Sequence, residues 1–269
     1  MPAHEDFRSL HRSGTPLVLA NAWDVASARL VEEAGAAAVA TTSAGVAWSL
    51  GAPDGNRLGA DRTAELVARI AAAVRVPVSG DIESGFADEP QGVTQTVARI
   101  VAAGAVGINL EDSTHEDAPL YPVELAAERV AAARAASDRL FVNARTDVFL
   151  NKVGAPQTRL DATLERAAAY LAAGADGIFV PGVTDPDTVA ALVAGIDAPV
   201  NVLTGPGAPS IAELAAVGVA RISVGSKLVL RAYAAARKAA EELFGVGTYG
   251  GLAGGLDYAA VNALLARNR

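Results

Sequence analysis

The stretch VAAGAVGINLE, residues 101–111, decides the fold prediction because it joins the end of a helix to a buried strand. Gly104 suits the left-handed C-cap of a helix, a conformation that glycine adopts at little cost. The apolar run after it is nearly continuous rather than alternating, which is typical of a parallel strand buried on both faces. Similar junctions are EEAGAAAVATT (32–42), LAAGADGIFVP (171–181) and AAVGVARISVG (215–225). The chain is therefore expected to alternate helices with parallel strands.

Eight apolar runs fit buried strands of this kind. They are residues 17–22, 37–45, 76–83, 106–112, 140–146, 176–182, 199–204 and 221–225. Amphipathic helical stretches separate them, for example residues 61–74 and 159–174. Eight such units predict an α/β fold, a closed (β/α)8 TIM-type barrel. The alternative is an open doubly wound sheet, but the glycine-rich dinucleotide fingerprint is absent after the first run.

The domain organisation follows from the length of 269 residues and from the loops. No linker divides the chain, so we expect a single domain with the barrel in residues 1–245. Residues 246–269 are expected to belong to it as a glycine-rich connection and a C-terminal helix. Three strand-to-helix segments are long: 46–60, 113–122 and 147–158. Because such loops build the active sites of α/β barrels, we expect them to border the site.

The composition excludes several functional classes. The chain has no cysteine, which excludes a disulfide scaffold, a thiolate zinc site and a cysteine nucleophile. The formal net charge of −8 argues against nucleic acid and against an anionic membrane surface as partners. The N-terminal sequence does not have the pattern of a signal peptide, and no apolar stretch is long enough to span a membrane. We therefore expect a cytoplasmic protein that acts on a small molecule.

Carboxylates gather at the predicted ends of the third and fourth strands. Asp81 and Glu83 in GDIESG (80–85) are two residues apart, so on a strand both side chains point the same way. Glu111 ends the next strand, about 4.8 Å away, and can share their site. Three such carboxylates repel one another unless a cation or proton lies among them, and all-oxygen ligands suit Mg²⁺ or Mn²⁺. The alternative is that they cap helices or pair with Arg145.

Two further motifs suit an anionic substrate. Arg145 in NARTD ends the fifth strand, and its guanidinium fits bidentate recognition of a carboxylate. The alternative role is a structural partner of Glu111 or Asp147. TTSAG (41–45) ends the second strand and can present a hydroxyl group and backbone N–H groups to an anion, although the same residues also fit a plain turn.

The remaining polar candidates are less specific. Asn143 and Asn201 lie on predicted strands and, taken alone, fit satisfied core amides better than substrate ligands. His4 and His11 are expected to be solvated because they lie near the N-terminus. His115 in the loop after the fourth strand fits either a mobile acid/base or a plain surface histidine, and we favour the surface histidine.

Together these motifs resemble the isocitrate lyase/phosphoenolpyruvate mutase superfamily. The resemblance runs from about residue 16 to residue 245 and depends on the order of six segments. They are LVLANAWDVASARLVEEAG, TTSAG, the GAPDG loop (51–55), DIESGF, NLEDS and NARTD. The resemblance implies an α/β barrel that binds Mg²⁺ and a pyruvate-like unit, and that makes or breaks a C–C or P–C bond beside it.

The resemblance also implies roles for individual residues. Asp81 is the expected closest metal ligand, and the shell is completed, partly through water, by Glu83, Glu111 and Asp54. The expected substrate-binding residues are Ser43, Ala44, Gly45, Asp81, Arg145 and Asn201. Those expected to take part in catalysis are Arg145, Glu111 and Asp54. A metal chelated by the carboxylate and 2-oxo oxygens would stabilise the enolate that forms when the adjacent bond breaks.

Departures from the best-known members narrow the expected reaction. The cysteine-containing loop of isocitrate and methylisocitrate lyases is replaced by STHEDAPLYP (113–122), which also lacks the mutase-type lysine. Glu83 stands where those groups commonly carry an aspartate. We therefore expect a Mg²⁺-dependent lyase on a small 2-oxo (di)carboxylic acid, such as an oxaloacetate decarboxylase or another C–C lyase. The alternatives are phosphonate chemistry (a phosphonopyruvate hydrolase or a carboxyphosphonoenolpyruvate phosphonomutase) and a barrel that binds 2-oxo acids without turnover. By resemblance we also expect a homotetramer that exchanges its C-terminal helices.

Overall fold

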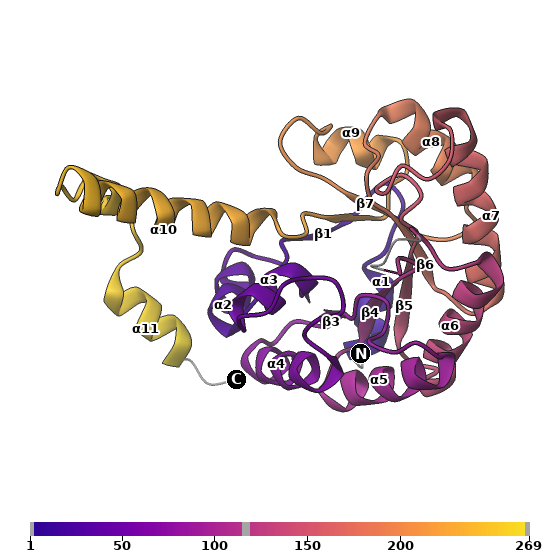
Figure 1. The fold of residues 1–269 in the computed structure, drawn as a ribbon, viewed down its shortest axis with the longest axis horizontal. Coiled ribbons are helices and arrows are strands. Elements are labelled where there is room, and N and C mark those ends of the chain that lie inside the picture. Colours follow the sequence, from indigo (N-terminus) through magenta and orange to yellow (C-terminus); the bar gives the residue numbers. More distant parts are fainter. Residues whose placement is uncertain (1–2, 115–118, 267–269) are drawn as a thin grey trace.

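Eight parallel strands close into a barrel surrounded by helices in the computed structural model, which describes residues 3–114 and 119–266 (Figure 1). The strands are β1 (Leu17–Leu19), β2 (Val39–Ala40), β3 (Val78–Asp81), β4 (Gly107–Glu111), β5 (Phe141–Arg145), β6 (Gly177–Val180), β7 (Val200–Leu203) and β8 (Arg221–Ser223). The hydrogen-bonded order is β1-β8-β7-β6-β5-β4-β3-β2, and a parallel bridge between Ala22 and Thr41 joins the two ends. The predicted (β/α)8 barrel is confirmed.

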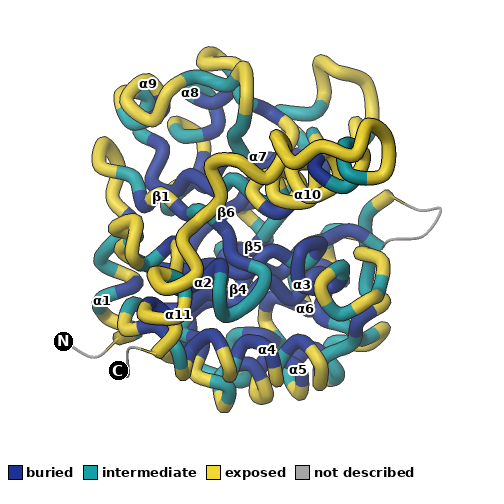
Figure 2. Tube along the Cα trace, turned by 90° about the vertical axis from the view of Figure 1, so that its left-hand side faces the viewer, coloured by how far each residue is buried: buried dark blue, intermediate teal, exposed yellow. Residues whose placement is uncertain are grey.

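Helices follow the strands around the outside of the barrel. They are α1 (Ala3–Ser9), α2 (Val25–Glu33), α3 (Ser43–Ser49), α4 (Ala60–Ala73), α5 (Pro90–Ala102), α6 (Val123–Ala136), α7 (Arg159–Ala172), α8 (Pro186–Gly195), α9 (Ile211–Ala216), α10 (Lys227–Gly245) and α11 (Tyr258–Ala266). Short 3-10 turns span Pro156–Thr158 and Gly250–Leu252. The strands and the inner helix faces form the buried core, while the outer helix faces are exposed (Figure 2).

Each of the eight predicted runs contains one strand that is shorter than the run, and the largest difference is at the second run. The run 37–45 holds only the short strand β2, and α3 begins at Ser43, so the predicted loop 46–60 starts inside a helix. The N–H of Thr42 still bonds to Ala22 in the bridge that closes the barrel, and Thr42 is also the N-cap residue of α3, so the chain turns into the helix directly after this bridge. Strands β3 and β4, whose ends carry the candidate carboxylates, pair in parallel with Asp81 opposite Asn109.

Aromatic side chains fill the barrel at the amino ends of the strands. Phe7 of α1 is fully buried and lies so close to Gly107 that a Cβ there would be 2.5 Å from its ring. Contrary to expectation, His11 is buried. Its ring stacks on Phe141 at 3.9 Å, and Nδ1 lies 2.9 Å from the carbonyl oxygen of Phe7. The sequence pattern missed this because the contact joins residues far apart in the chain.

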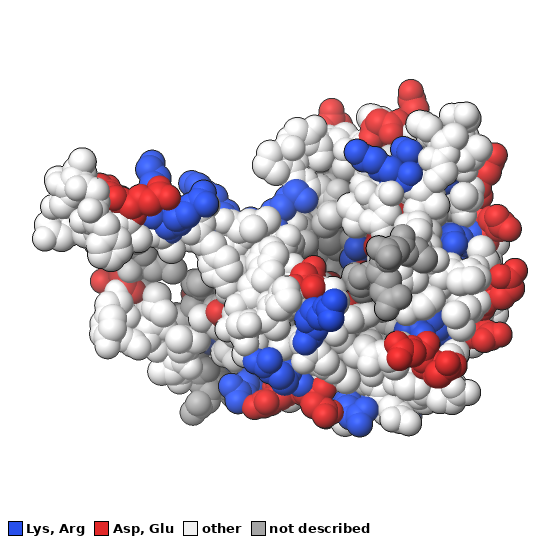
Figure 3. Space-filling view, viewed as in Figure 1, with Lys and Arg blue, Asp and Glu red and all other residues white. Residues whose placement is uncertain are grey.

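The C-terminal part of the chain leaves the barrel. Helix α10 projects away from it, and α11 turns back toward α2, where Arg29 donates to the carbonyl oxygen of Leu264 over 2.8 Å (Figure 1). Most of α10 is exposed, and both positive and negative side chains lie along it (Figure 3). Among the helices of the described ranges, none has the length and apolar character needed to cross a membrane.

The buried histidine predicts a specific dependence of stability on pH. Burial lowers the pKa of His11 to about 3, and the charge of Arg221 adds to the effect. Between the ordinary value of 6.5 and about 3, the unfolded chain binds more protons at His11 than the folded chain does. This contribution to the free energy of unfolding is complete above pH 6.5 and falls by up to about 1.4 kcal/mol per pH unit below it.

Urea unfolding at a series of pH values measures the effect as a difference between variants. His11→Phe keeps the stacked ring and is expected to lose less stability than the wild type as the solution is acidified. His4→Gln, on the preceding helix, is the control and should follow the wild type. Identical slopes for all three proteins would show that His11 does not resist protonation.

Candidate active site

Asp81 lies at the centre of the candidate site, at the carboxyl end of β3. Its side chain is 9% exposed. Oδ2 accepts the backbone N–H of Ser43 at 3.1 Å, and its own N–H donates to the Thr41 hydroxyl group at 2.8 Å. Burial raises the pKa of Asp81 to about 6, Glu111 adds to the rise and Arg145 opposes it. The carboxylate therefore accepts hydrogen bonds from backbone N–H groups, and the positive charge of Arg145 offsets only part of its negative charge.

Glu83 reaches the same region by a route that the sequence did not predict. It lies beyond the end of β3 with φ +51°. Contrary to the prediction, strand alternation therefore does not align its side chain with that of Asp81, although the two carboxylates still act on each other. Its carboxylate accepts the backbone N–H of Asn56. Burial raises the pKa of Glu83 to about 7, against the Asn56 contact, and nearby acids including Asp54 and Asp81 add to the rise.

Arg129 holds the loop that carries this left-handed residue. Its buried guanidinium donates to the carbonyl oxygens of Ser84, Ala87 (2.7 Å) and Asp88 (2.8 Å). A non-glycine residue at positive φ costs energy, and such residues persist where surrounding contacts determine the backbone. Arg129 supplies those contacts from α6. No sequence motif marked it, because its partners are backbone carbonyls far away in the chain.

Arg145 lies opposite the acids and binds two of them. Its Nη1 is 2.6 Å from Oε2 of Glu111, its partner in the β4–β5 register. Nε and Nη2 donate to the two carboxylate oxygens of Asp147 at 2.6 and 2.9 Å. Glu111 and Asp147 are therefore both structural partners of Arg145, which is the alternative role that the sequence left open. Fixed in this way, the guanidinium is pre-organised to receive a further carboxylate.

The second-strand motif provides part of the expected anion site. Ser43 begins α3, and its N–H points at Asp81. Ala44 and Gly45 are buried in the same turn. Asp54, by contrast, is exposed, although its charge acts on both Asp81 and Glu83. The expected substrate and catalytic roles of these four residues are not tested by this geometry and stay predictions.

Asn201 lies in a closed polar network inside the barrel. Its Oδ1 accepts from Nδ2 of Asn143 at 3.0 Å, and its own Nδ2 lies 3.2 Å from Oγ of Ser223. Asn143 also donates to Asn109, which accepts from the fully buried Arg221 at 3.0 Å. These contacts match the interpretation of Asn201 as a satisfied core amide, and its role toward substrate stays a prediction. His115 lies outside the described residues.

The clustered acids can be tested for their fit to a divalent cation. Within the described ranges, no three acidic or histidine side chains form a ready-made metal shell. Asp81, Glu83 and Glu111 are nevertheless buried within electrostatic range of one another, and all their donors are oxygen atoms. Mg²⁺ commonly takes one or two carboxylates and keeps several waters. The residues present therefore fit Mg²⁺ bound by few direct contacts and by others through water.

Comparisons with known proteins show which family the chain resembles along most of its length. The family described as phosphoenolpyruvate phosphomutase matches residues 7–244. An uncharacterised protein of Mycobacterium tuberculosis is 44% identical over 220 residues, covering 82% of this chain and 81% of that protein. Oxaloacetate decarboxylase 2 of Pseudomonas fluorescens is 32% identical over 259 residues, covering 90% and 86%. A crystal structure of phosphonopyruvate hydrolase with oxalate and Mg²⁺ has a TM-score of 0.86 at 26% identity, covering 98% and 95% of the two chains.

The tight packing of the α3 turn predicts that Gly45 tolerates no side chain. A Cβ at this position would lie 2.8 Å from Cβ of Trp23 and 2.9 Å from Cγ2 of Thr42. Gly45→Ala is expected to lower the free energy of unfolding by about 1–3 kcal/mol because it overpacks the turn. Gly245→Ala is the matched control, since nothing lies within 4 Å of its added Cβ. Urea unfolding checks this, and equal stability of the two variants would contradict it.

Proposed function

The chain belongs to the phosphoenolpyruvate phosphomutase family of the isocitrate lyase/PEP mutase superfamily, and we propose that it is a Mg²⁺-dependent carbon–carbon lyase. The proposed substrate is a small 2-oxo dicarboxylic acid of the oxaloacetate type. The observation that carries this proposal is the group of three buried carboxylates facing a pre-organised arginine at one end of the barrel. That combination suits a cation and an anionic substrate held side by side.

The absence of cysteine favours decarboxylation within this family. No thiol can donate or remove a proton in this chain. Decarboxylation of an oxaloacetate-type acid releases CO₂ and leaves the electron pair of the broken C–C bond on the 2-oxo unit. That step needs charge stabilisation rather than a strong general acid. The similarity to an oxaloacetate decarboxylase over 90% of this chain supports the same choice.

Mg²⁺ would be held by Asp81, with Glu83 and Glu111 acting through bound water. When bound, it supplies Lewis-acid stabilisation of the negative charge that develops on the substrate oxygens. The all-oxygen donor set equally admits Mn²⁺. Asp54 would contribute its charge from the loop above the cluster, since it already acts on Asp81 and Glu83.

The chain's own donors would bind and orient the substrate. Each terminal nitrogen of Arg145 donates one N–H to a neighbouring acid and carries a second that can bind a substrate carboxylate. The Ser43 hydroxyl group and the backbone N–H groups of Ala44 and Gly45 would receive another carboxylate, because the Ser43 N–H already donates to Asp81. Asp147 keeps the guanidinium plane fixed during this binding. Orientation of this kind lowers the entropic part of the barrier.

Phosphonate chemistry is the second candidate. The structural similarity to phosphonopyruvate hydrolase, at 26% identity over nearly the whole chain, favours it over unrelated activities. The same acids and arginine would then bind a 2-oxo phosphonate. Phosphate release from phosphonopyruvate separates the two candidates, because a carbon–carbon lyase is expected to form pyruvate from oxaloacetate and to release no phosphate from phosphonopyruvate. A barrel that only binds would bind oxalate with Mg²⁺ and convert neither compound.

Removing the central carboxylate tests the proposed function. Asp81→Ala is expected to reduce Mg²⁺-dependent pyruvate formation from oxaloacetate by a factor of about 100 or more, since it removes a proposed direct metal ligand. Chelation of metal from the wild type should have the same effect. Asp61→Ala, which removes an exposed carboxylate, is the control and should keep full activity. Turnover above the uncatalysed rate by metal-free Asp81→Ala would refute the mechanism.

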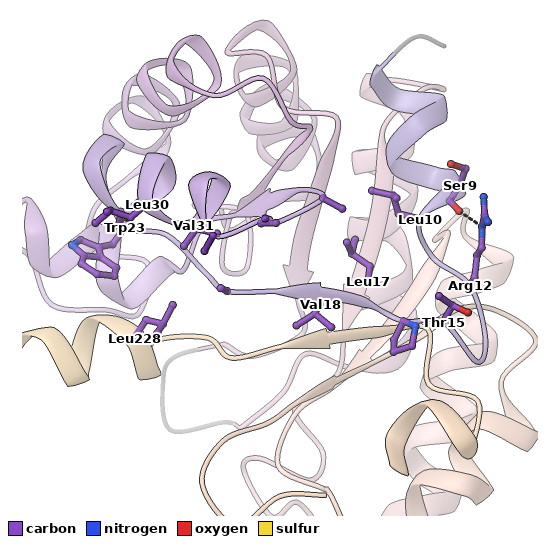
Figure 4. Close-up of a pocket in the computed structure, with 17 residues that line it drawn as sticks. Ser9, Leu10, Arg12, Thr15, Leu17, Val18, Trp23, Leu30, Val31 and Leu228 are labelled. Carbon is purple, nitrogen blue, oxygen red and sulfur yellow. Dashed lines mark hydrogen bonds between the residues drawn. The ribbon is translucent and has the colours of Figure 1, made fainter. Parts of the chain in front are cut away.

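We further propose that copies of this chain assemble through their C-terminal residues 244–265, called here the C-terminal arm. Most of its large apolar side chains face solvent, with Phe244 90%, Val246 76% and Tyr249 74% exposed, whereas Leu264 is buried. The chain also has an apolar groove of about 850 Å³ between β1 and α2, lined by residues including Val18 and Leu30 (Figure 4). An exposed arm and an open groove on one chain suit reciprocal burial between copies.

Sedimentation tests this assembly. The wild type is expected to sediment as a multiple of 27.2 kDa, by resemblance a tetramer. Phe244→Asp should dissociate it, because burying the new carboxylate against apolar side chains is unfavourable. Glu241→Gln, on the exposed face of α10, is the control and should not. A wild-type monomer at micromolar concentration would exclude the proposal.

A further inference from the structure

A buried polar triad lies behind the candidate site, between β4 and α7. Oδ2 of Asp112 accepts the hydroxyl group of Tyr170 at 2.7 Å and Nη1 of Arg166 at 3.0 Å. The same Arg166 nitrogen lies 3.0 Å from the Tyr170 hydroxyl oxygen, so the three side chains contact one another. Asp112 is 3% exposed and Tyr170 1% exposed. These three side chains are called the triad below.

The triad is connected to Arg145 through a second carboxylate. The other oxygen of Asp112, Oδ1, accepts the backbone N–H of Asp147 at 2.9 Å. The Asp147 carboxylate in turn binds Arg145 in two places, at 2.6 and 2.9 Å. The backbone gives a further connection, because the N–H of Asp112 donates to the carbonyl oxygen of Arg145 at 3.1 Å. The position of Asp112 therefore fixes both the backbone and the side-chain partner of Arg145.

The protonation of the triad suits this connection. Burial, together with the neighbouring Asp112 charge, raises the pKa of Tyr170. The phenol therefore stays protonated, and its O–H group donates a hydrogen bond to Asp112. Arg166 supplies the positive charge that offsets the buried carboxylate. It also donates to the backbone carbonyl oxygen of Tyr121 at 3.0 Å, which holds the guanidinium in place. A buried ion pair is rarely the cheapest way to stabilise a core, and its benefit is often a unique geometry.

We propose that Asp112, Arg166 and Tyr170 are positioning residues that set the orientation of the Arg145 guanidinium toward substrate. The substrate contact of Arg145 rests on the proposed function, whereas its orientation by the triad does not. Second contacts of this kind around a functional side chain decide whether it is held within a few tenths of an ångström of its productive position.

Tyr170→Phe is the decisive variant, because it removes one donor to Asp112 and keeps the ring. Two measurements are made on the full-length protein: the crystal structure without ligand, and oxalate binding in the presence of Mg²⁺ by calorimetry. We expect the Asp147–Arg145 pair to shift away from Glu111 and the dissociation constant for oxalate to rise about tenfold. Arg166→Lys keeps the positive charge but loses the planar guanidinium group that contacts Asp112, Tyr170 and Tyr121 together. It should act in the same direction and replaces Tyr170→Phe as the test variant if that variant folds poorly.

A matched control lies on the same helix. Thr163 is fully buried in α7 and donates to the carbonyl oxygen of Arg159 at 2.7 Å, outside the triad. Thr163→Val is expected to lower the melting temperature while leaving the Arg145 position and oxalate binding unchanged. If Thr163→Val weakened oxalate binding as much as Tyr170→Phe does, the effect would come from destabilising α7 and not from the triad, and the inference would be overturned.

A double-mutant cycle with Asp147→Asn tests whether the effect travels through Asp147. In the Asp147→Asn background, Tyr170→Phe is expected to weaken oxalate binding by less than twofold further, because the connection is already broken. Full additivity would overturn the inference, as would an unmoved Arg145 in Tyr170→Phe crystals. If the wild type fails to bind oxalate with Mg²⁺ but Arg145 moves in Tyr170→Phe, the proposed function is wrong and the positioning role stands.

Discussion

The repulsion among three buried carboxylates at one end of the barrel is the constraint on which the rest of this site depends. Asp81, Glu83 and Glu111 are removed from water by the strand ends that carry them. One guanidinium, that of Arg145, offsets part of this charge, and it is shared with Asp147. Under the proposed function, a bound divalent cation would offset this excess of negative charge.

Local patterns predicted the barrel and the placement of the acids. Continuous apolar runs marked all eight strands, and a glycine cap preceded four of them, because a parallel strand buried on both faces leaves a strong trace in sequence. Since the carboxyl ends of parallel strands meet at one end of a barrel, the grouping of Asp81, Glu111 and Arg145 followed from their positions along three runs. The register that pairs Glu111 with Arg145 agrees with that expectation.

What the sequence could not supply depends on contacts between distant residues. The left-handed backbone of Glu83 is maintained by Arg129, 46 positions later, and nothing local to GDIESG signals it. His11 looked solvated because its partners, Phe141 and Arg221, lie in other parts of the chain. Asp112 follows β4 and Tyr170 lies on α7, 58 positions later, so no local pattern joins them. In each case a polar group is satisfied by tertiary structure, which periodicity does not encode.

The aromatic rings of Phe7, His11 and Phe141 pack at the amino ends of the strands, at the opposite end of the barrel from the acids. Under the proposed function, substrate would enter and product would leave at the carboxyl ends of the strands. A product that left slowly would compete directly with the next substrate, so the rate of product release would set an upper limit on turnover, however fast the bond-breaking step became.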